Sequence, residues 1–152
     1  MEVLVTALPS KLIYGLWANS SDKTISKDIP ALSERFYNAV GKTPESVLPF
    51  FVLSNNYDET SGHFNLFIGS EIQHEQLDTY ELSAGEYGKI TVKPKFGFIW
   101  GLSVGEAKRY FYTKWLPASE YHALNMEYEL HTEKSIGKKP EIEILFAIKK
   151  NI

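Results

Sequence analysis

The chain has 152 residues and a formal net charge of −3, which fits one globular domain large enough to bury its own core. A weakly acidic chain without a dense basic cluster argues against direct nucleic-acid binding. The absence of cysteine excludes disulfides and thiolate metal sites, and the four histidines lack metal-ligand spacing, so we expect no metal or cofactor. Without a signal-like start or an apolar run of about 18 residues, a soluble cytoplasmic protein without membrane contact is expected.

The first half of the chain predicts two strands, a helix and a hairpin. Alternation indicates a strand over residues 1–8, with residues 11–19 as its continuation. A helix is expected from Asp28, a good N-cap, to Gly41. Its apolar stripe consists of Ile29, Leu32, Phe36 and Val40. Residues 49–55 and 63–72 predict the two strands of the hairpin.

The second half of the chain predicts a similar series of elements. Extended segments are expected over residues 77–82 and 86–93. A second helix should begin at Ser103, which forms a capping box with Glu106, and should stop at Pro117. Its apolar stripe consists of Val104, Ala107, Phe111 and Trp115. The last two strands are expected over residues 121–131 and 141–149.

Two similar halves, about 1–76 and 77–152, account for this order of elements. Tyr14-Gly15 recurs 73 positions later as Tyr87-Gly88, and the helical stripes start 75 positions apart. Each half reads strand, helix, strand, strand. The predicted class is therefore an α+β single domain of two βαββ units with antiparallel sheets and two helices. A chance likeness between two ordinary α/β segments is the alternative.

A pseudo-twofold cleft between the halves is the expected binding site. The helix of a βαββ unit covers one sheet face, and the free faces of two paired units can enclose a hollow. Ile142, Ile144, Phe146 and Ile148 share a strand face that should pack under a helix. Aromatic residues form 14% of the chain, and a carboxylate among rings suits an organic cation. Glu129 is the candidate, although alternation alone favours a solvated strand face shared with Glu127.

Several segments resemble the GyrI-like small-molecule-binding domains. This family includes the effector-binding domains of AraC-type and multidrug-sensing regulators and the DNA gyrase inhibitory protein. The most specific segment is Tyr112–Tyr121, which contains the family's W-L-P-x-S-x-Y run, followed by the aromatic-Glu pair Tyr128-Glu129. The resemblance extends over nearly the whole chain, including residues 29–36, 55–57, 64–72, 84–87 and 141–148.

This resemblance implies an SHS2-like duplicated fold that binds a small hydrophobic, cationic ligand beside Glu129. The expected ligand contacts are Trp17, Phe51, Phe67, Tyr87, Trp100, Trp115, Tyr121, Glu129 and Leu145. Leu145 and Ala147 depart from the family's Tyr and Pro, and Glu127 competes with Glu129 for the pocket role. A stand-alone binding protein is the first hypothesis. The alternatives are a hydrolase of electrophilic cyclopropane-type cytotoxins with Glu129 as general base, and an interaction protein that modulates DNA gyrase or a regulator.

Overall fold

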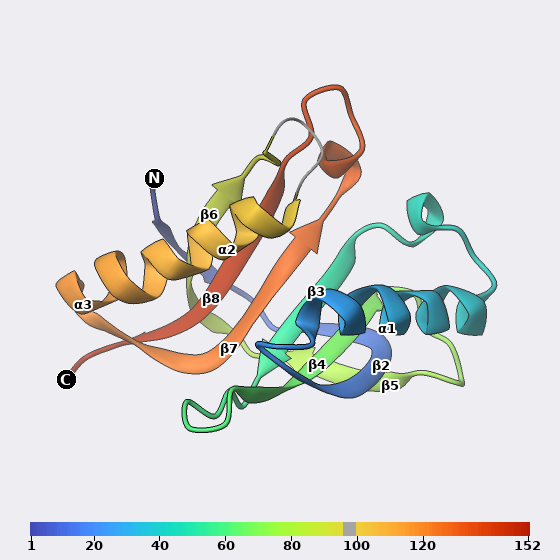
Figure 1. Cartoon of the computed structure of the whole chain (residues 1–152), viewed down its shortest axis with the longest axis horizontal. Coiled ribbons are helices and arrows are strands. Elements are labelled where there is room, and N and C mark those ends of the chain that lie inside the picture. Colours follow the sequence, from blue (N-terminus) through green and yellow to red (C-terminus); the bar gives the residue numbers. More distant parts are fainter. Residues whose placement is uncertain (96–99) are drawn as a thin grey trace.

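A computed structural model describes residues 1–95 and 100–152 of the chain (Figure 1). The strands in these ranges are β1 (Leu4–Leu8), β2 (Lys11–Ser21), β3 (Phe50–Asn55), β4 (His63–Ser70), β5 (Asp78–Leu82), β6 (Gly85–Val92), β7 (Tyr121–His131) and β8 (Ile142–Lys150). The helices are α1 (Ile25–Val40), α2 (Trp100–Tyr110) and α3 (Leu116–Ala118), with a π-helical turn over Phe111–Trp115 between the last two. Short 3-10 turns cover Pro44–Val47 and Glu133–Ser135.

The strands form one antiparallel sheet of eight strands in the order β1-β6-β8-β7-β3-β4-β2-β5. The two halves meet at the central pair, β7 and β3, and the order outward from each is the same: β8 and β6 on one side, β4 and β2 on the other. This arrangement confirms the predicted duplicated α+β fold.

The outermost strands are exchanged between the halves. β1 pairs with β6, so that Leu4 lies opposite Lys89, and β5 pairs with β2, so that Tyr80 lies opposite Ile13. The prediction that residues 11–19 continue the strand over residues 1–8 is therefore wrong. Pro9 lacks the N–H that a continuous ladder needs, and β1 leaves β2 to pair with the far half.

Both helices cover the same face of this sheet (Figure 1). In α1, Leu32 and Phe36 are buried against the α1-side cluster, which includes Val52, Leu66 and Ile68. In the α2 segment, which is α2 with the following π-helical turn, Val104, Ala107 and Phe111 of the predicted stripe are buried in the α2-side cluster, and Trp115 packs against it partly buried. That cluster contains Ile90, Val92, Ile142, Ile144, Phe146 and Ile148. The prediction that the isoleucine-rich face of the last strand packs under a helix is confirmed.

Both helices begin earlier than predicted. α1 starts at Ile25, and Asp28 lies in its first turn, where its Oδ2 accepts hydrogen bonds of 2.7 Å from the hydroxyls of Ser20 and Thr24. α2 includes Trp100, so Ser103 lies inside the helix. The predicted capping box is wrong, because Glu106 forms an ion pair of 3.2 Å with Lys95 instead.

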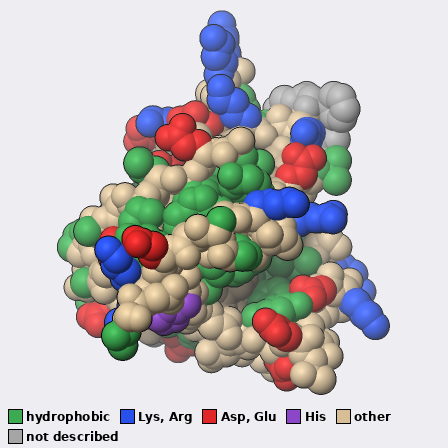
Figure 2. All heavy atoms as spheres, turned by 90° about the vertical axis from the view of Figure 1, so that its left-hand side faces the viewer, with side chains coloured by type: hydrophobic (Ala, Val, Ile, Leu, Met, Phe, Trp, Pro, Cys, Tyr) green, Lys and Arg blue, Asp and Glu red, His purple; other side chains and the backbone are tan. Residues whose placement is uncertain are grey.

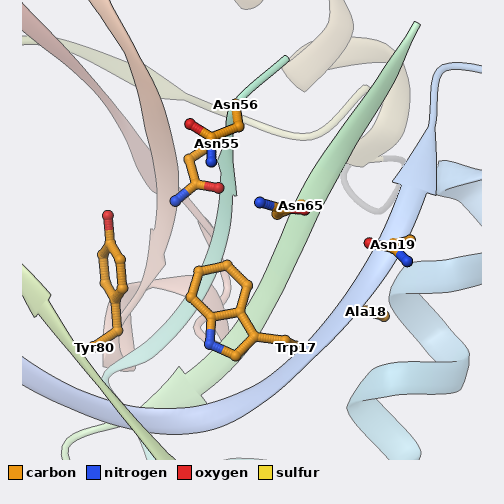
Figure 3. Close-up of a pocket in the computed structure, with 7 residues that line it drawn as sticks. All are labelled: Trp17, Ala18, Asn19, Asn55, Asn56, Asn65 and Tyr80. Atoms are coloured by element: carbon orange, nitrogen blue, oxygen red, sulfur yellow. The ribbon is translucent and has the colours of Figure 1, made fainter. Parts of the chain in front are cut away.

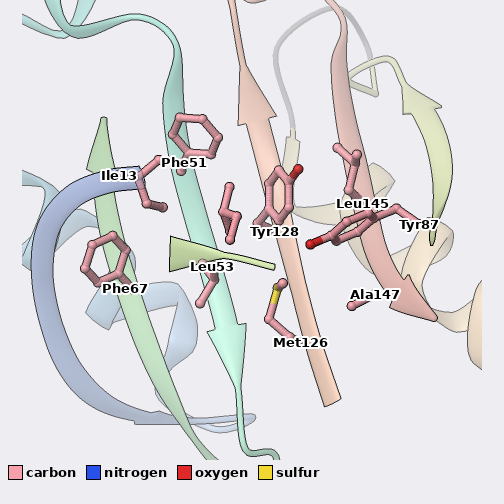
Figure 4. Close-up of a cluster of buried hydrophobic side chains, with 10 residues drawn as sticks. Ile13, Phe51, Leu53, Phe67, Tyr87, Met126, Tyr128, Leu145 and Ala147 are labelled. Atoms are coloured by element: carbon pink, nitrogen blue, oxygen red, sulfur yellow. The ribbon is translucent and has the colours of Figure 1, made fainter. Parts of the chain in front are cut away.

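β2 curves strongly (Figure 4), and its Gly15 lies opposite Gly69 of β4. A Cβ atom added at Gly15 would lie 2.0 Å from the Ile68 carbonyl oxygen, a distance that no side chain tolerates. The curvature of β2 brings Tyr80 and Leu82 of β5 against the sheet face opposite the helices, which we call the free face. None of the described helices is long and apolar enough to cross a membrane.

Candidate functional site

Apolar side chains from both halves meet on the free face, as Figure 4 shows. This free-face core consists of Ile13, Phe51, Leu53, Phe67, Leu82, Tyr87, Met126, Tyr128, Leu145 and Ala147. Four predicted ligand contacts belong to it, and Trp17, a fifth, packs against its edge. The Tyr87 hydroxyl donates a 2.6 Å hydrogen bond to the Ser83 carbonyl, which fixes the ring. Rings from both halves gather on this face, and in this structure their side chains fill the centre.

A pocket of about 530 Å³ opens at one end of the free-face core (Figure 3). We call it the amide pocket, because its lining is Trp17, Ala18, Asn19, Asn55, Asn56, Asn65 and Tyr80. Trp17 contacts Tyr80 edge to face at a centroid distance of 5.4 Å and Phe67 at 4.8 Å. Pockets of this size hold drug-sized molecules.

Three asparagines form a row across neighbouring strands at this pocket. Asn19 of β2 lies opposite Asn65 of β4, which lies opposite Asn55 of β3. Because these positions share the face of Trp17 and Phe67, their amides border the same pocket. We call these three residues the amide row.

Reciprocal hydrogen bonds fasten the loop beside the amide row to β7. The Tyr57 amide N–H donates to Asn125 Oδ1 at 2.8 Å, and Asn125 Nδ2 donates to the Tyr57 carbonyl at 3.1 Å. Asn56 and Asn125 both adopt left-handed backbone conformations, with φ of 55° and 58°. Asparagine tolerates that conformation better than most residues, which favours a preformed rim.

Glu129 does not lie in this hollow. It is opposite Val52 of β3 and Ile144 of β8, which belong to the two helix-side clusters. Laterally paired residues point to the same side of a sheet, so Glu129 and Glu127 lie on the helix face. The expectation that Glu129 shares a hollow with Trp17, Phe67 and Leu145 is wrong.

On the helix face, Glu127 and Glu129 belong to an acid cluster that also contains Lys108, Tyr112 and His131. Glu127 Oε2 lies 3.0 Å from Lys108 Nζ, and its Oε1 accepts a 2.7 Å hydrogen bond from the Tyr112 hydroxyl. His131 Nε2 lies 3.3 Å from Glu129 Oε1. The side chain of Glu129 is 12% exposed and that of Glu127 is 15% exposed, so both carboxylates are largely removed from water.

The charges of this cluster shift its pKa values. Burial opposes the ionisation of Glu129, but the hydrogen bond with His131 and the nearby Lys108 outweigh it and lower the pKa of Glu129. Burial likewise opposes protonation of Lys108, but the charges of Glu127 and Glu129 raise its pKa. Burial, followed by the charge of Glu127, raises the pKa of Tyr112 far above its usual value. At neutral pH, Glu129 is therefore ionised and Lys108 is protonated.

The remaining predicted contacts also lie on the helix side. The Trp100 ring lies 6.2 Å from His131, beside the acid cluster. Trp115 and Tyr121 stack at 6.0 Å at the edge of the α2-side cluster, and the Tyr121 hydroxyl donates to Glu86 at 3.2 Å. The structure thus divides the predicted contact set between the two faces of the sheet.

The space-filling view in Figure 2 shows acidic and basic side chains mixed on one side of the molecule, around a hollow bordered by hydrophobic side chains. No broad basic patch lies on that side. Among the described residues, no group of three or more His, Asp or Glu is placed to hold a metal ion.

Sequence reasoning missed the amide row, Tyr80 and Lys108. Asn19, Asn55 and Asn65 fall near strand ends, where asparagine usually indicates a turn, so only the strand register shows that they are neighbours. Tyr80 reaches the pocket through the exchange of β5. Charged residues on helices are usually solvated, and nothing in the spacing of Lys108 signals an inward direction.

No family model and no curated protein matches the chain. Among solved structures, the chain is 14% identical to SAV2435 bound to tetraphenylphosphonium, with a TM-score of 0.71 over 98% of this chain and 94% of that chain. It is 16% identical to the EcmrR C-terminal domain, with a TM-score of 0.64 over 98% of each chain. It is also 16% identical to a Vibrio cholerae integron cassette protein, with a TM-score of 0.69 over 97% of this chain and 95% of that chain. The chain therefore shares the fold of SAV2435 and the EcmrR C-terminal domain, in agreement with its resemblance to the GyrI-like domains.

Proposed function

We propose that this protein binds a small hydrophobic organic molecule in the amide pocket. The observation that carries the proposal is a pocket of about 530 Å³ whose wall combines the rings of Trp17 and Tyr80 with the amide row. Ring faces contribute apolar contact, and a few amides fix the orientation of a ligand, which is the usual composition of a small-molecule site. The bound cation of SAV2435, a protein with the same fold, supports a small organic ligand.

Removal of the Trp17 ring tests this proposal. A thermal-shift screen of aromatic compounds, followed by calorimetric titration of the hits, should find ligands that Trp17→Ala weakens at least about fivefold, since stacking on one ring contributes about 1–3 kcal/mol. Trp115→Ala is the matched control, because it removes the same ring from the opposite face. If no compound binds, or if both variants weaken binding equally, the amide pocket is not the site.

A second candidate is an organic-cation site at the acid cluster, as the sequence predicted for Glu129. It is favoured by two carboxylates, Glu127 and Glu129, that lie beside a single lysine, Lys108. Rings lie close by: Phe50 and Trp100 are each 6.2 Å from His131. A cation near these rings and the carboxylate would gain both ring and charge attraction.

Tetraphenylphosphonium is the probe for this second candidate. Glu129→Gln should weaken its binding about tenfold or more, whereas Glu75→Gln, an exposed change of the same net charge, should leave it unaltered. Equal affinities for the two variants would rule out Glu129 as the counter-ion. A general-base role for Glu129 is less favourable, because the lowered pKa makes this carboxylate a weak base at neutral pH.

A further inference from the structure

The amide pocket contains a hydrogen-bonding group that the protein leaves unused. Asn55 Oδ1 is buried, and within the described ranges it has no hydrogen-bond partner. Figure 3 shows the Asn55 amide nitrogen turned toward Tyr80 and its oxygen toward Asn65. A primary amide offers acceptor positions on oxygen and two donors on nitrogen. Since a buried polar atom without a partner is costly, a ligand that pairs with this amide is strongly favoured over one that does not.

The lining of the pocket carries no formal charge. Its seven residues are a tryptophan, a tyrosine, an alanine and four asparagines. The carboxylates of Glu127 and Glu129 point to the other side of the sheet, so they supply no counter-charge here. A charged ligand would lose hydration in the pocket without gaining an ion pair.

The rings of the pocket favour a flat ligand. Trp17 and Tyr80 meet at an interplanar angle of 80°, so the two ring planes form adjoining walls of one corner. A planar ring can stack on one wall and meet the other at its edge, the two arrangements that aromatic rings prefer. The amide row then lies along the border of the ring-lined corner, where it meets the edge of such a ligand (Figure 3).

We infer that the ligand of the amide pocket is a neutral planar heterocycle with a lactam edge, in which an N–H donor and a C=O acceptor are adjacent. This inference rests on the proposed function and adds the chemical class of the ligand. An asparagine amide pairs with such an edge through two parallel hydrogen bonds, as asparagine does with the edge of adenine. In that arrangement Asn55 Oδ1 accepts from the ligand N–H and Asn55 Nδ2 donates to the ligand carbonyl.

Three compounds with the same two-ring skeleton test the N–H donor, the lactam carbonyl and the charge of the ligand separately: 2-quinolinone, 1-methyl-2-quinolinone and the 1-methylquinolinium cation. The methyl group of the second compound removes the N–H donor, and the third compound replaces the lactam by a positive charge. On the wild-type chain, ligand-observed NMR titration should show 2-quinolinone binding about 5-fold to about 150-fold more tightly than its methyl derivative, the range expected for one bidentate pair. The cation should bind more weakly than 2-quinolinone.

Asn55→Leu, which has nearly the same shape but no amide, should bring the ratio of the first two affinities to about one. Asn38→Leu, which changes an exposed asparagine on α1, should leave the ratio unchanged. Because the compounds are compared on the wild-type chain, the inference can be tested even if Asn55→Leu fails to fold.

Failure of the inference and failure of the proposed function give different results. Equal binding of the two quinolinones that still depends on Trp17 would refute lactam recognition while supporting the pocket. Tightest binding of the cation would refute neutrality of the ligand. Binding that is unaffected by Trp17→Ala would refute the pocket itself.

Discussion

Replacing Lys108 by Met should destabilise the protein by about 2–4 kcal/mol at about pH 7.5. Lys108 Nζ lies 3.0 Å from Glu127 Oε2, and the two side chains are 26% and 15% exposed. Methionine retains an unbranched apolar stem of similar length, so the change removes mainly the charge. Glu127 then keeps only its hydrogen bond from Tyr112.

The magnitude follows from two effects that act in the same direction. Breaking a buried ion pair costs about 3–5 kcal/mol, and the partial exposure of Lys108 reduces that cost toward the lower value. Glu127 and Glu129 are two residues apart on one strand face, and without Lys108 their negative charges repel each other.

The loss of stability in Lys108→Met should become smaller as the pH falls. The pKa of Glu129 is lowered in the folded state, so its ionisation adds stability above the pKa of the unfolded chain, and this contribution is lost as the pH falls through the folded value. Lys108→Met removes one cause of that lowering. The folded variant then takes up a proton more readily, so its deficit should be smaller at about pH 5 than at about pH 7.5.

Urea denaturation at both pH values measures this difference in the free energy of unfolding. Lys114→Met, which removes an exposed lysine, is the control and should change stability by less than about 0.5 kcal/mol. The double variant Lys108→Met, Glu127→Gln should recover most of the loss, since it removes both charges of the pair. A deficit below about 0.5 kcal/mol, or one that is the same at both pH values, would refute the coupling described for the acid cluster.

Two further predictions concern the frame of the fold. Gly15→Ala should cost more than about 3 kcal/mol of unfolding free energy or prevent folding, because the added Cβ would lie 2.0 Å from the Ile68 carbonyl oxygen. Gly137→Ala has open space and should be nearly neutral. Urea denaturation followed by circular dichroism compares the two variants, and a stable Gly15→Ala would show that β2 can straighten. Phe111→Ala should lower the stability measured in calorimetric melts by about 3–5 kcal/mol, because its fully buried ring stacks on Phe146 at a centroid distance of 3.9 Å. Leu102→Ala, at a position that is 58% exposed, should cost far less. Equal losses would mean that the Phe111 ring does not anchor the α2 segment.

Residue patterns predicted the packing of the helices well. The stripes of both helices pack against the sheet on the face where the helical period places them, and the isoleucine-rich face of β8 lies under the α2 segment. Periodicity works here because burial on one face is the dominant energetic requirement of an amphipathic element.

The sequence repeat predicted the duplication, but its dipeptide match joins positions that are not equivalent. Tyr14 lies opposite Ser70, which lies opposite Phe50 of the α1-side cluster, whereas Tyr87 belongs to the free-face core. The two tyrosines therefore point to opposite faces of the sheet, although the dipeptide is the same. The order of elements carried the prediction of the fold, and Tyr-Gly did not.

The face of Glu129 could not be predicted, because it depends on the register between strands. Alternation groups Glu127 with Glu129 but leaves open which side of β7 faces the helices. The register of β7 against β8 also shifts between Ala123 and Glu127, around the left-handed Asn125. β7 gains two residues over β8 there, so Ala123 and Glu127 still share a face, but no pattern in the chain marks this irregularity.

The two halves share a frame, but only one of them forms the amide pocket. In the first half, β5 brings Tyr80 beside Trp17 of β2. On the other side of the sheet, β1 is the exchanged strand that pairs with β6. It places Thr6 opposite Tyr87, and that position lacks a second ring. Duplication therefore supplies the continuous sheet and the free-face core, whereas recognition depends on residues that the second half does not repeat. The amide row also runs through β2, β4 and β3 alone, so the amide pocket lies at one end of the pseudo-twofold frame.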